Sequence, residues 1–223
     1  SAECRPTPPG AAPWDTEHPN LYRCIAELLD AEGQVLHSRE TSFGFRTAVF
    51  RADGFYLNGK KTFLRGLNRH QSYPYIGYAA PESLQRQDAR ILKNELHCNA
   101  VRTSHYPQSQ YFLDECDRLG LLVFTELPGW QHIGDEAWKD RACAMLREML
   151  LQNRNHPSII LWGVRINESV DDDEFYTRTN QIAHALDPSR ATSGVRYLEK
   201  SHLLEDVYAY NDFSHNGSNA GVK

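Results

Sequence analysis

The chain has 223 residues, of which 40% are hydrophobic and 24% are charged, so it holds enough apolar material for one large core and is not mainly disordered. Lys and Arg number 24 against 29 Asp and Glu, and the net charge of −5 disfavours nucleic acid as a partner. No apolar run approaches the roughly 20 residues that a membrane helix needs, so we expect no membrane association through such a helix.

The five cysteines are scattered, odd in number and never spaced as Cys-x-x-Cys. This pattern favours neither a disulfide framework nor a zinc site. It agrees best with a reducing compartment such as the cytoplasm, although the sequence alone leaves the localisation unknown.

Two antiparallel hairpins are predicted in the first third of the chain. Apolar stretches at 21–29 and 34–46 flank the turn Asp30-Ala-Glu-Gly33, which is typical of two strands joined by a turn. A second hairpin is expected at 55–57 and 61–64 around Asn58-Gly59, because both turn residues tolerate positive φ.

From residue 63 onward, strand and helix patterns alternate, which is typical of βα units around a parallel sheet. Helices are predicted within 84–96, 110–118, 138–150 and 175–186, and buried strands at 63–67, 100–103, 121–126, 159–163, 192–197 and 207–211. A complete barrel needs eight strands and typically about 250 residues. The fold class is therefore α/β, an incomplete (β/α)8 TIM barrel of about six βα units.

Polar residues follow nearly every predicted strand of this barrel. They occur at Asn68-Arg-His-Gln71, Arg102 to Pro107, Thr125-Glu126, Asn167-Glu168 and Tyr210-Asn-Asp212. Because the catalytic residues of βα barrels lie where strands end and loops begin, this distribution predicts a functional site at the carboxyl edge of the sheet.

Asn167-Glu168 is the most informative pair. A carboxylic acid at a strand end can protonate a leaving oxygen while a neighbouring amide holds a substrate hydroxyl. A solvated loop or a structural ion pair would also account for a glutamate here. Arg102 closes an apolar strand, so we expect it to pair with a carboxylate at the barrel mouth.

His70 and His105 have two interpretations. They could be ligands of a metal-dependent barrel hydrolase, which also gathers histidines at strand ends. The sequence has neither a His-x-His nor a Glu-x-x-His arrangement, so hydrogen bonding to a polar substrate is favoured.

Two long motifs resemble glycoside hydrolase family 2, the β-galactosidase and β-glucuronidase family. Asn99-Ala-Val-Arg-Thr-Ser-His-Tyr-Pro107 is similar to one signature, and the segment from Arg154-Asn-His-Pro157 to Asn167-Glu168 is similar to the second. Phe43-Gly-Phe-Arg46 and the stretch 57–70 resemble the end of the family's immunoglobulin-like sandwich and its entry to the barrel. The resemblance implies part of an immunoglobulin-like β-sandwich at 1–53 and the first part of the catalytic barrel at 54–223.

Position by position, the resemblance implies that Glu168 is the general acid/base and that Asn167 contacts the sugar 2-hydroxyl. His70 and His105 would contact the sugar, and Arg102 would orient the nucleophile. Tyr210 is a candidate for the tyrosine near the nucleophile.

Two departures from the family pattern carry consequences. Galactosidases with magnesium beside the acid have Glu-x-His after the third strand, whereas this chain has Glu126-Leu-Pro-Gly-Trp-Gln-His132, so we expect neither a metal nor another cofactor. The family's nucleophilic glutamate follows the seventh strand, and nothing after Asn211 supplies it. Glu199 and Glu205 precede the sixth strand.

The resulting expectation is part of a retaining β-galactosidase-like glycosidase acting on a carbohydrate, with the nucleophile beyond the chain. A β-glucuronidase, another family 2 glycosidase and a noncatalytic carbohydrate-binding barrel remain alternative functions. The protein could also form a homo-oligomer. The two carboxyls of a retaining mechanism lie about 5–5.5 Å apart, so a chain with only one of them should be nearly inactive.

Overall fold

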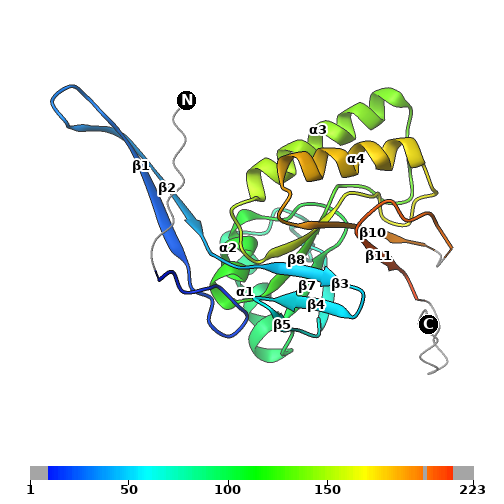
Figure 1. The fold of residues 1–223 in the computed structure, drawn as a ribbon, viewed down its shortest axis with the longest axis horizontal. Coiled ribbons are helices and arrows are strands. Elements are labelled where there is room, and N and C mark those ends of the chain that lie inside the picture. Colours follow the sequence, from blue (N-terminus) through cyan, green and yellow to red (C-terminus); the bar gives the residue numbers. More distant parts are fainter. Residues whose placement is uncertain (1–9, 198–199, 213–223) are drawn as a thin grey trace.

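The computed structural model describes residues 10–197 and 200–212. Residues 1–9, 198–199 and 213–223 lie outside the described part, so the position of Glu199 is not described. Figure 1 shows a long hairpin projecting from a body in which helices cover a parallel sheet.

The body is a six-stranded parallel sheet with strands in sequence order. The strands are β6 (Gly66–Arg69), β7 (Ala100–Thr103), β8 (Leu122–Glu126), β9 (Ile159–Gly163), β10 (Ala191–Arg196) and β11 (Val207–Tyr210). This topology confirms the incomplete TIM barrel. The first strand begins at Gly66 rather than Phe63, because the Asn99 side chain bonds the carbonyl of Phe63 and the amide of Arg65 in place of a strand ladder.

Four helices lie on one face of this sheet and confirm the predicted helical segments with slightly different bounds (Figure 1). They are α1 (Glu82–Arg90), which continues into the π-helical turn η1 (Ile91–Glu95), α2 (Gln110–Leu119), α3 (Glu136–Asn153) and α4 (Asp173–Leu186). Asp135 caps the N-terminus of α3, since its side chain accepts a hydrogen bond from the amide of Trp138. Gly120 ends α2 with φ of 68°, a conformation that favours glycine.

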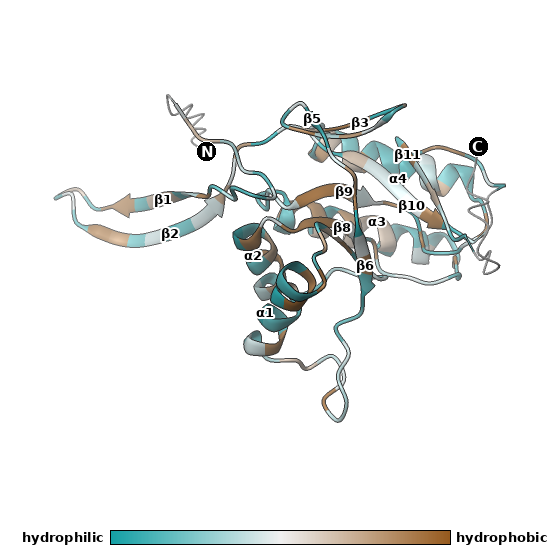
Figure 2. Ribbon diagram, turned by 90° about the horizontal axis from the view of Figure 1, so that it is seen from below, coloured by the Kyte–Doolittle hydropathy of each residue, from teal (hydrophilic) through white to brown (hydrophobic). Residues whose placement is uncertain are grey.

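Two apolar clusters lie on the two faces of the sheet. Val101, Val123 and Trp162 point toward the helices and join the larger cluster. Leu122 and Leu161 point to the concave side, where they pack with Trp14 and the β4 side chains of Phe55 and Leu57. Figure 2 shows the hydrophobic central strands against helices that are largely hydrophilic on the outside. The sheet is thus covered by helices on one face and only partly covered on the other.

The amino-terminal strands form two separate antiparallel units. β1 (Tyr22–Leu29) and β2 (Val35–Phe43) make the projecting, mostly exposed hairpin. β3 (Ala48–Arg51), β4 (Gly54–Leu57) and β5 (Lys60–Lys61) form a three-stranded sheet. Within the described residues β1 and β2 pair only with each other, and the β3–β4 pairing crosses the expected domain boundary at 53/54.

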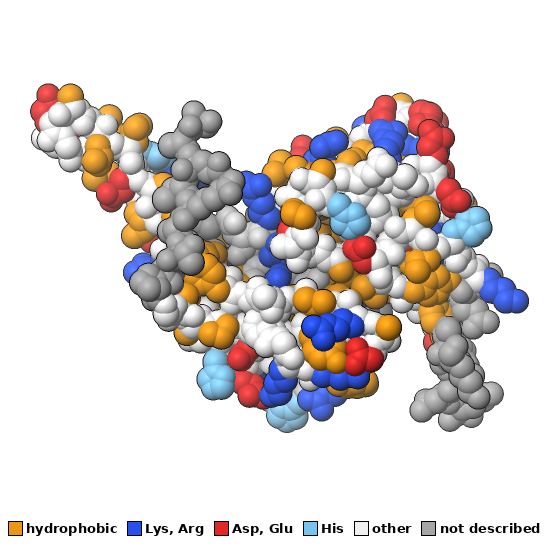
Figure 3. All heavy atoms as spheres, in the orientation of Figure 1, with side chains coloured by type: hydrophobic (Ala, Val, Ile, Leu, Met, Phe, Trp, Pro, Cys, Tyr) orange, Lys and Arg blue, Asp and Glu red, His pale blue; other side chains and the backbone are white. Residues whose placement is uncertain are grey.

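In the described part of the chain, Cys24, Cys98, Cys116 and Cys143 are free thiols. No helix described in the structure has the length and apolar character of a membrane span. Figure 3 shows acidic and basic side chains interspersed over one face of the molecule.

Candidate active site at the carboxyl edge of the sheet

The sequence-predicted site residues lie at or just beyond the carboxyl ends of the parallel strands. His70 follows β6, Arg102 lies in β7 with His105 just after it, Asn167 and Glu168 follow β9, and Tyr210 ends β11. Parallel strands place these ends on one edge of the sheet. The structure brings Arg102, His105 and Asn167 into direct contact, with Glu168 next to them.

Arg102 is the centre of a polar network. Its Nε donates to Oε1 of Glu126 at 2.6 Å, and its Nη2 donates to Oδ1 of Asn167 at 2.6 Å. Nδ1 of His105 lies 3.1 Å from both the Arg102 Nη2 and the Glu126 Oε2, so its role depends on the ring tautomer. The expected carboxylate partner of Arg102 is therefore Glu126, a buried residue at the end of β8.

Asn167 is buried, and only one side of its amide is satisfied. Its Oδ1 accepts the hydrogen bond from Arg102, whereas its buried Nδ2 has no described partner within hydrogen-bond distance, although the Asn167 side chain helps to lower the pKa of the neighbouring Glu168. Buried polar atoms are usually paired, and an unpaired donor costs about 1–3 kcal/mol. The Nδ2–H group of Asn167, next to Glu168, can therefore donate a further hydrogen bond.

Glu168 is half-buried, and its backbone is in the left-handed region with φ of 56°. Its amide donates to the carbonyl of Val195 at 2.8 Å, which fixes the residue against β10. Oε2 accepts from Nε1 of Trp130 at 2.9 Å and from Nε2 of Gln131 at 3.0 Å. Oε1 accepts from Nδ2 of Asn211 at 2.6 Å.

These contacts set the charge state of Glu168 in this chain. Burial raises the pKa of the carboxyl group, but the hydrogen bonds from Trp130 and Gln131 outweigh it and leave the pKa below its ordinary value. Glu168 is therefore ionised at neutral pH here.

Trp130, Gln131, Asn211 and Glu126 are site residues that no sequence pattern singled out. All four lie at or just after the ends of β8 and β11, so the rule that pointed to the strand ends covers them. What was missing was any reason to choose these side chains over their neighbours. Trp162, in β9 ahead of Glu168, is buried and donates from its indole N–H to Asp187, so it belongs to the core.

The remaining predicted residues lie farther from Glu168. The ring of His70 packs edge-on against His105, with centroids 5.4 Å apart, and lies 5.9 Å from Tyr106. Burial, followed by the charges of His105 and Arg102, lowers the pKa of His70. The ring of Tyr210 is tilted against that of Tyr208, with centroids 6.2 Å apart, and the residue after it, Asn211, makes the bond to Glu168.

The polar groups around the two carboxylates do not fit a cation beside Glu168. Both oxygens of Glu126 face Arg102 and His105, and Oε2 of Glu168 faces two N–H donors. A cation at these oxygens would have to displace those donors. The expectation of a metal-free site stays a prediction that a chelator can test.

One group in the described part, formed by Asp114, Asp117 and His156, has the spacing of a metal site. It lies at α2 and just before β9, away from the carboxyl edge of the sheet (the rim). Both ring nitrogens of His156 are taken, by Asp117 at 2.6 Å and by Gln110 at 3.1 Å, and Asp117 also accepts from the amide of Ser158. We therefore interpret this group as a structural hydrogen-bond network.

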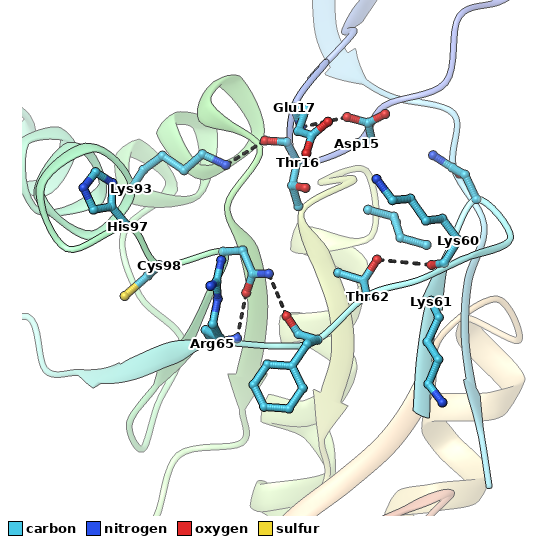
Figure 4. Close-up of a pocket in the computed structure, with 14 residues that line it drawn as sticks. Asp15, Thr16, Glu17, Lys60, Lys61, Thr62, Arg65, Lys93, His97 and Cys98 are labelled. Carbon is cyan, nitrogen blue, oxygen red and sulfur yellow. Dashed lines mark hydrogen bonds between the residues drawn. The ribbon is translucent and has the colours of Figure 1, made fainter. Parts of the chain in front are cut away.

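A cavity of about 650 Å³ lies at the opposite edge of the sheet, next to the starts of β6 and β7 (Figure 4). Lys60, Arg65 and Lys93 are among its lining residues. The Lys93 ammonium group already bonds the carbonyls of Thr16 and Gly120. This cavity is separate from the residues around Glu168.

The fold and the rim define a segment of a TIM barrel whose carboxyl edge carries a carboxylate held by neutral donors. A family model for the TIM barrel domain of glycosyl hydrolases family 2 matches residues 49–216, and a model described as glycosyl hydrolases family 2 matches residues 7–46. The chain therefore belongs to glycosyl hydrolase family 2.

Named relatives agree with this assignment. The chain is 61% identical over 210 residues to a β-galactosidase of Thermoanaerobacterium thermosulfurigenes, covering 94% of the chain and 29% of the relative. It is 58% identical over 204 residues to a β-galactosidase of Thermoanaerobacter pseudethanolicus, covering 91% and 27%. β-Glucuronidase 3 of Bacteroides uniformis superposes with a TM-score of 0.81 at 38% identity, covering 90% and 27%. The chain thus spans less than a third of these proteins.

Proposed function

We propose that this chain carries the acid/base half of the active site of a retaining β-glycosidase. In this mechanism Glu168 protonates the glycosidic oxygen and later deprotonates the attacking water. The observation that carries the proposal is the placement of Glu168 at the carboxyl edge of the half barrel, bonded by three neutral N–H donors and adjacent to the Asn167 amide.

The unpaired donor of Asn167 supports a direct contact with the sugar. Its buried Nδ2 has no partner in the described part of the chain, and Arg102 fixes the orientation of the amide through Oδ1. A substrate hydroxyl placed beside Glu168 would satisfy this donor. We assign that hydroxyl to C2 of the sugar, which strengthens its hydrogen bonds in the transition state.

The second carboxyl of the mechanism has to come from outside the described residues. Within this chain the hydrogen bonds keep Glu168 ionised, which is the wrong state for a general acid. A second carboxylate about 5–5.5 Å away would raise the pKa of Glu168 by like-charge repulsion. We therefore expect the acid role, and so the hydrolysis, to need a nucleophilic glutamate beyond this chain.

The other predicted residues at the rim would bind the sugar and orient the nucleophile. His70 and His105 form a pair of rings from which the sugar hydroxyls can be hydrogen-bonded. Arg102, held by Glu126, would orient the nucleophile by charge. Tyr210 would lie near the nucleophile, at the side of β11 from which the missing strands of a barrel would continue.

β-Galactosides are the substrates we favour, because the two curated relatives are both named β-galactosidases at 61% and 58% identity. A β-glucuronide is the second candidate, since a solved β-glucuronidase matches the fold at 38% identity. The sugar-specific contacts would lie partly outside this chain.

The test is to join the chain to the rest of its reading frame and assay nitrophenyl β-galactoside and nitrophenyl β-glucuronide side by side. Hydrolysis with retained anomeric configuration is expected for the extended protein, and almost none for the chain alone. Activity that disappears with a chelator would instead favour a metal-dependent hydrolase. Sugar binding without hydrolysis by the extended protein would favour a noncatalytic carbohydrate-binding barrel.

A further inference from the structure

The two oxygens of the Glu168 carboxylate have different partners. Oε2 receives two N–H bonds from consecutive residues of the loop after β8, at 2.9 Å from Trp130 and 3.0 Å from Gln131. Oε1 receives one bond, at 2.6 Å, from the amide of Asn211 after β11. The two oxygens are therefore not interchangeable.

The chemistry of these partners decides where a proton can sit. An indole N–H only donates, so the oxygen facing Trp130 must act as an acceptor in both charge states of the acid. A primary amide both donates and accepts, so Asn211 can turn its Oδ1 toward an O–H group on Oε1. The neutral acid therefore keeps all its hydrogen bonds if Oε2 is the carbonyl oxygen and Oε1 carries the hydrogen.

The backbone fixes the donors in place. Trp130 and Asn167 form a parallel β-bridge, and the backbone N–H of Gln131 donates to the backbone carbonyl of Asn167 at 2.7 Å. Gln131 and Glu168 both have left-handed backbones, with φ of 62° and 56°. Such conformations are uncommon for residues other than glycine, so the surrounding bonds must hold both residues in them. Trp130, Gln131 and the acid therefore lie in two loops that are hydrogen-bonded to each other.

We propose that Trp130 and Gln131 are positioning residues that fix Oε2 of Glu168, so that Oε1 delivers the proton to the leaving group. This inference rests on the proposed glycosidase function. In the step, the Oε1–H bond breaks and the proton goes to the glycosidic oxygen. The bond between that oxygen and the sugar carbon breaks, and its electron pair stays on the oxygen. The sugar carbon forms a new bond to an oxygen of a carboxylate nucleophile.

Other charged groups near Glu168 act less directly. His105 lies behind Trp130, with ring centroids 5.9 Å apart, and Arg102 reaches the site through Asn167. A cavity of about 380 Å³ beside Glu168 is lined by three further charged residues, Asp171, Arg196 and Lys200. Asp171 is paired with Arg165, and Arg196 with Glu205.

The first test uses this chain as it stands and reads the titration of the Glu168 carboxyl carbon by NMR. Trp130→Phe keeps an aromatic ring but removes a donor that bonds the carboxylate more strongly than it bonds the carbonyl oxygen of the neutral acid. The midpoint should rise by about one pH unit, because a hydrogen bond to a charged group is lost. Gln131→Met should also raise it. His132→Gln is the matched control, since this neighbour packs on Trp138 instead of Glu168.

Asn211→Leu distinguishes the two oxygens. Asn211 serves the ionised acid as a donor and the neutral acid as an acceptor, so its removal should change the midpoint far less than Trp130→Phe does. An Asn211→Leu shift as large as that of Trp130→Phe would overturn the assignment of the proton to Oε1. Unchanged midpoints in Trp130→Phe and Gln131→Met would overturn the positioning role.

The second test uses the protein extended to the complete barrel. Trp130→Phe should move the alkaline limb of the kcat/KM profile to higher pH by the same amount as the NMR midpoint, which a merely structural role would not do. An unmoved limb would overturn the inference even if hydrolysis itself is confirmed. If the extended protein hydrolyses neither glycoside, the proposed function fails, and the proton-transfer role fails with it, whatever the NMR titration shows.

Discussion

Two regions of the molecule hold a carboxylate in opposite ways. At the interface of α1 and α2, the buried Glu115 is surrounded by the guanidinium groups of Arg86, Arg90 and Arg118. Burial would raise the pKa of Glu115, but the bonds from Arg118 and Arg90 lower it to about 2. At the rim, Glu168 has no such cation in contact among the residues that the structure describes, and its hydrogen bonds come from neutral N–H groups.

The difference teaches how a carboxylate is kept either structural or reactive. Guanidinium groups favour the ionised form so strongly that Glu115 stays charged at any ordinary pH. Neutral donors favour the anion less, so a further nearby charge can still bring the acid to the neutral form. Cationic partners suit a carboxylate that links two helices through ion pairs. Neutral donors suit a carboxylate that gives and takes a proton.

The largest expected effect separates the two carboxylates by activity. In the protein with the complete barrel, Glu168→Gln should lower kcat/KM about 1,000-fold for poor leaving groups and much less for good ones, because general acid catalysis is lost. Glu115→Gln should leave kcat/KM almost unchanged. Steady-state kinetics on a series of aryl glycosides measures both. An equal loss across the series would argue against an acid role for Glu168.

The next effect concerns the network behind the rim. Glu126→Gln removes the buried partner of Arg102 and should lower the free energy of unfolding by about 3 kcal/mol, since a largely desolvated guanidinium loses its counter-charge. Glu82→Gln is the control, because its pair with Arg86 is half exposed and should contribute less than about 1 kcal/mol. Urea unfolding of the chain measures both. Equal losses would mean that burial of the pair is unimportant.

A smaller effect is expected at the helix interface. Glu115→Gln should cost about 2 kcal/mol, less than for a fully buried pair because Arg90 and Arg118 are largely exposed. The folded pKa of about 2 lies below the ordinary 4.5, so this stabilisation is present above pH 4.5 and is lost as the pH falls toward 2. Unfolding at pH 7 and pH 3 should show a smaller acid-induced loss in the variant. An unchanged pH dependence would contradict this assignment.

The smallest expected effect is none at all. A chelator should not change the hydrolysis rate of the extended protein, because N–H and guanidinium donors face the carboxylates of Glu126 and Glu168. Added magnesium should not change it either. A loss of activity that magnesium restores would show that a cation displaces these donors.

Much of the fold could be predicted because its determinants are local. β7 and β9 were predicted with their observed bounds, since short runs of buried apolar residues end at polar ones. β6 begins three residues later than predicted, because the side chain of Asn99, distant in sequence, hydrogen-bonds the backbone groups of Phe63 and Arg65. A tertiary contact of this kind leaves no local pattern.

The sequence by itself determined the alternation of strands and helices, the edge at which polar residues gather and the Asn167-Glu168 pair, since each follows from residue types along one stretch of chain. The tertiary structure alone decided that Glu126 is the partner of Arg102 and that Trp130, Gln131 and Asn211 surround Glu168. The physical reason is that these side chains come from different strand ends. Their meeting depends on the strand register and on two left-handed loop residues, which no single segment encodes.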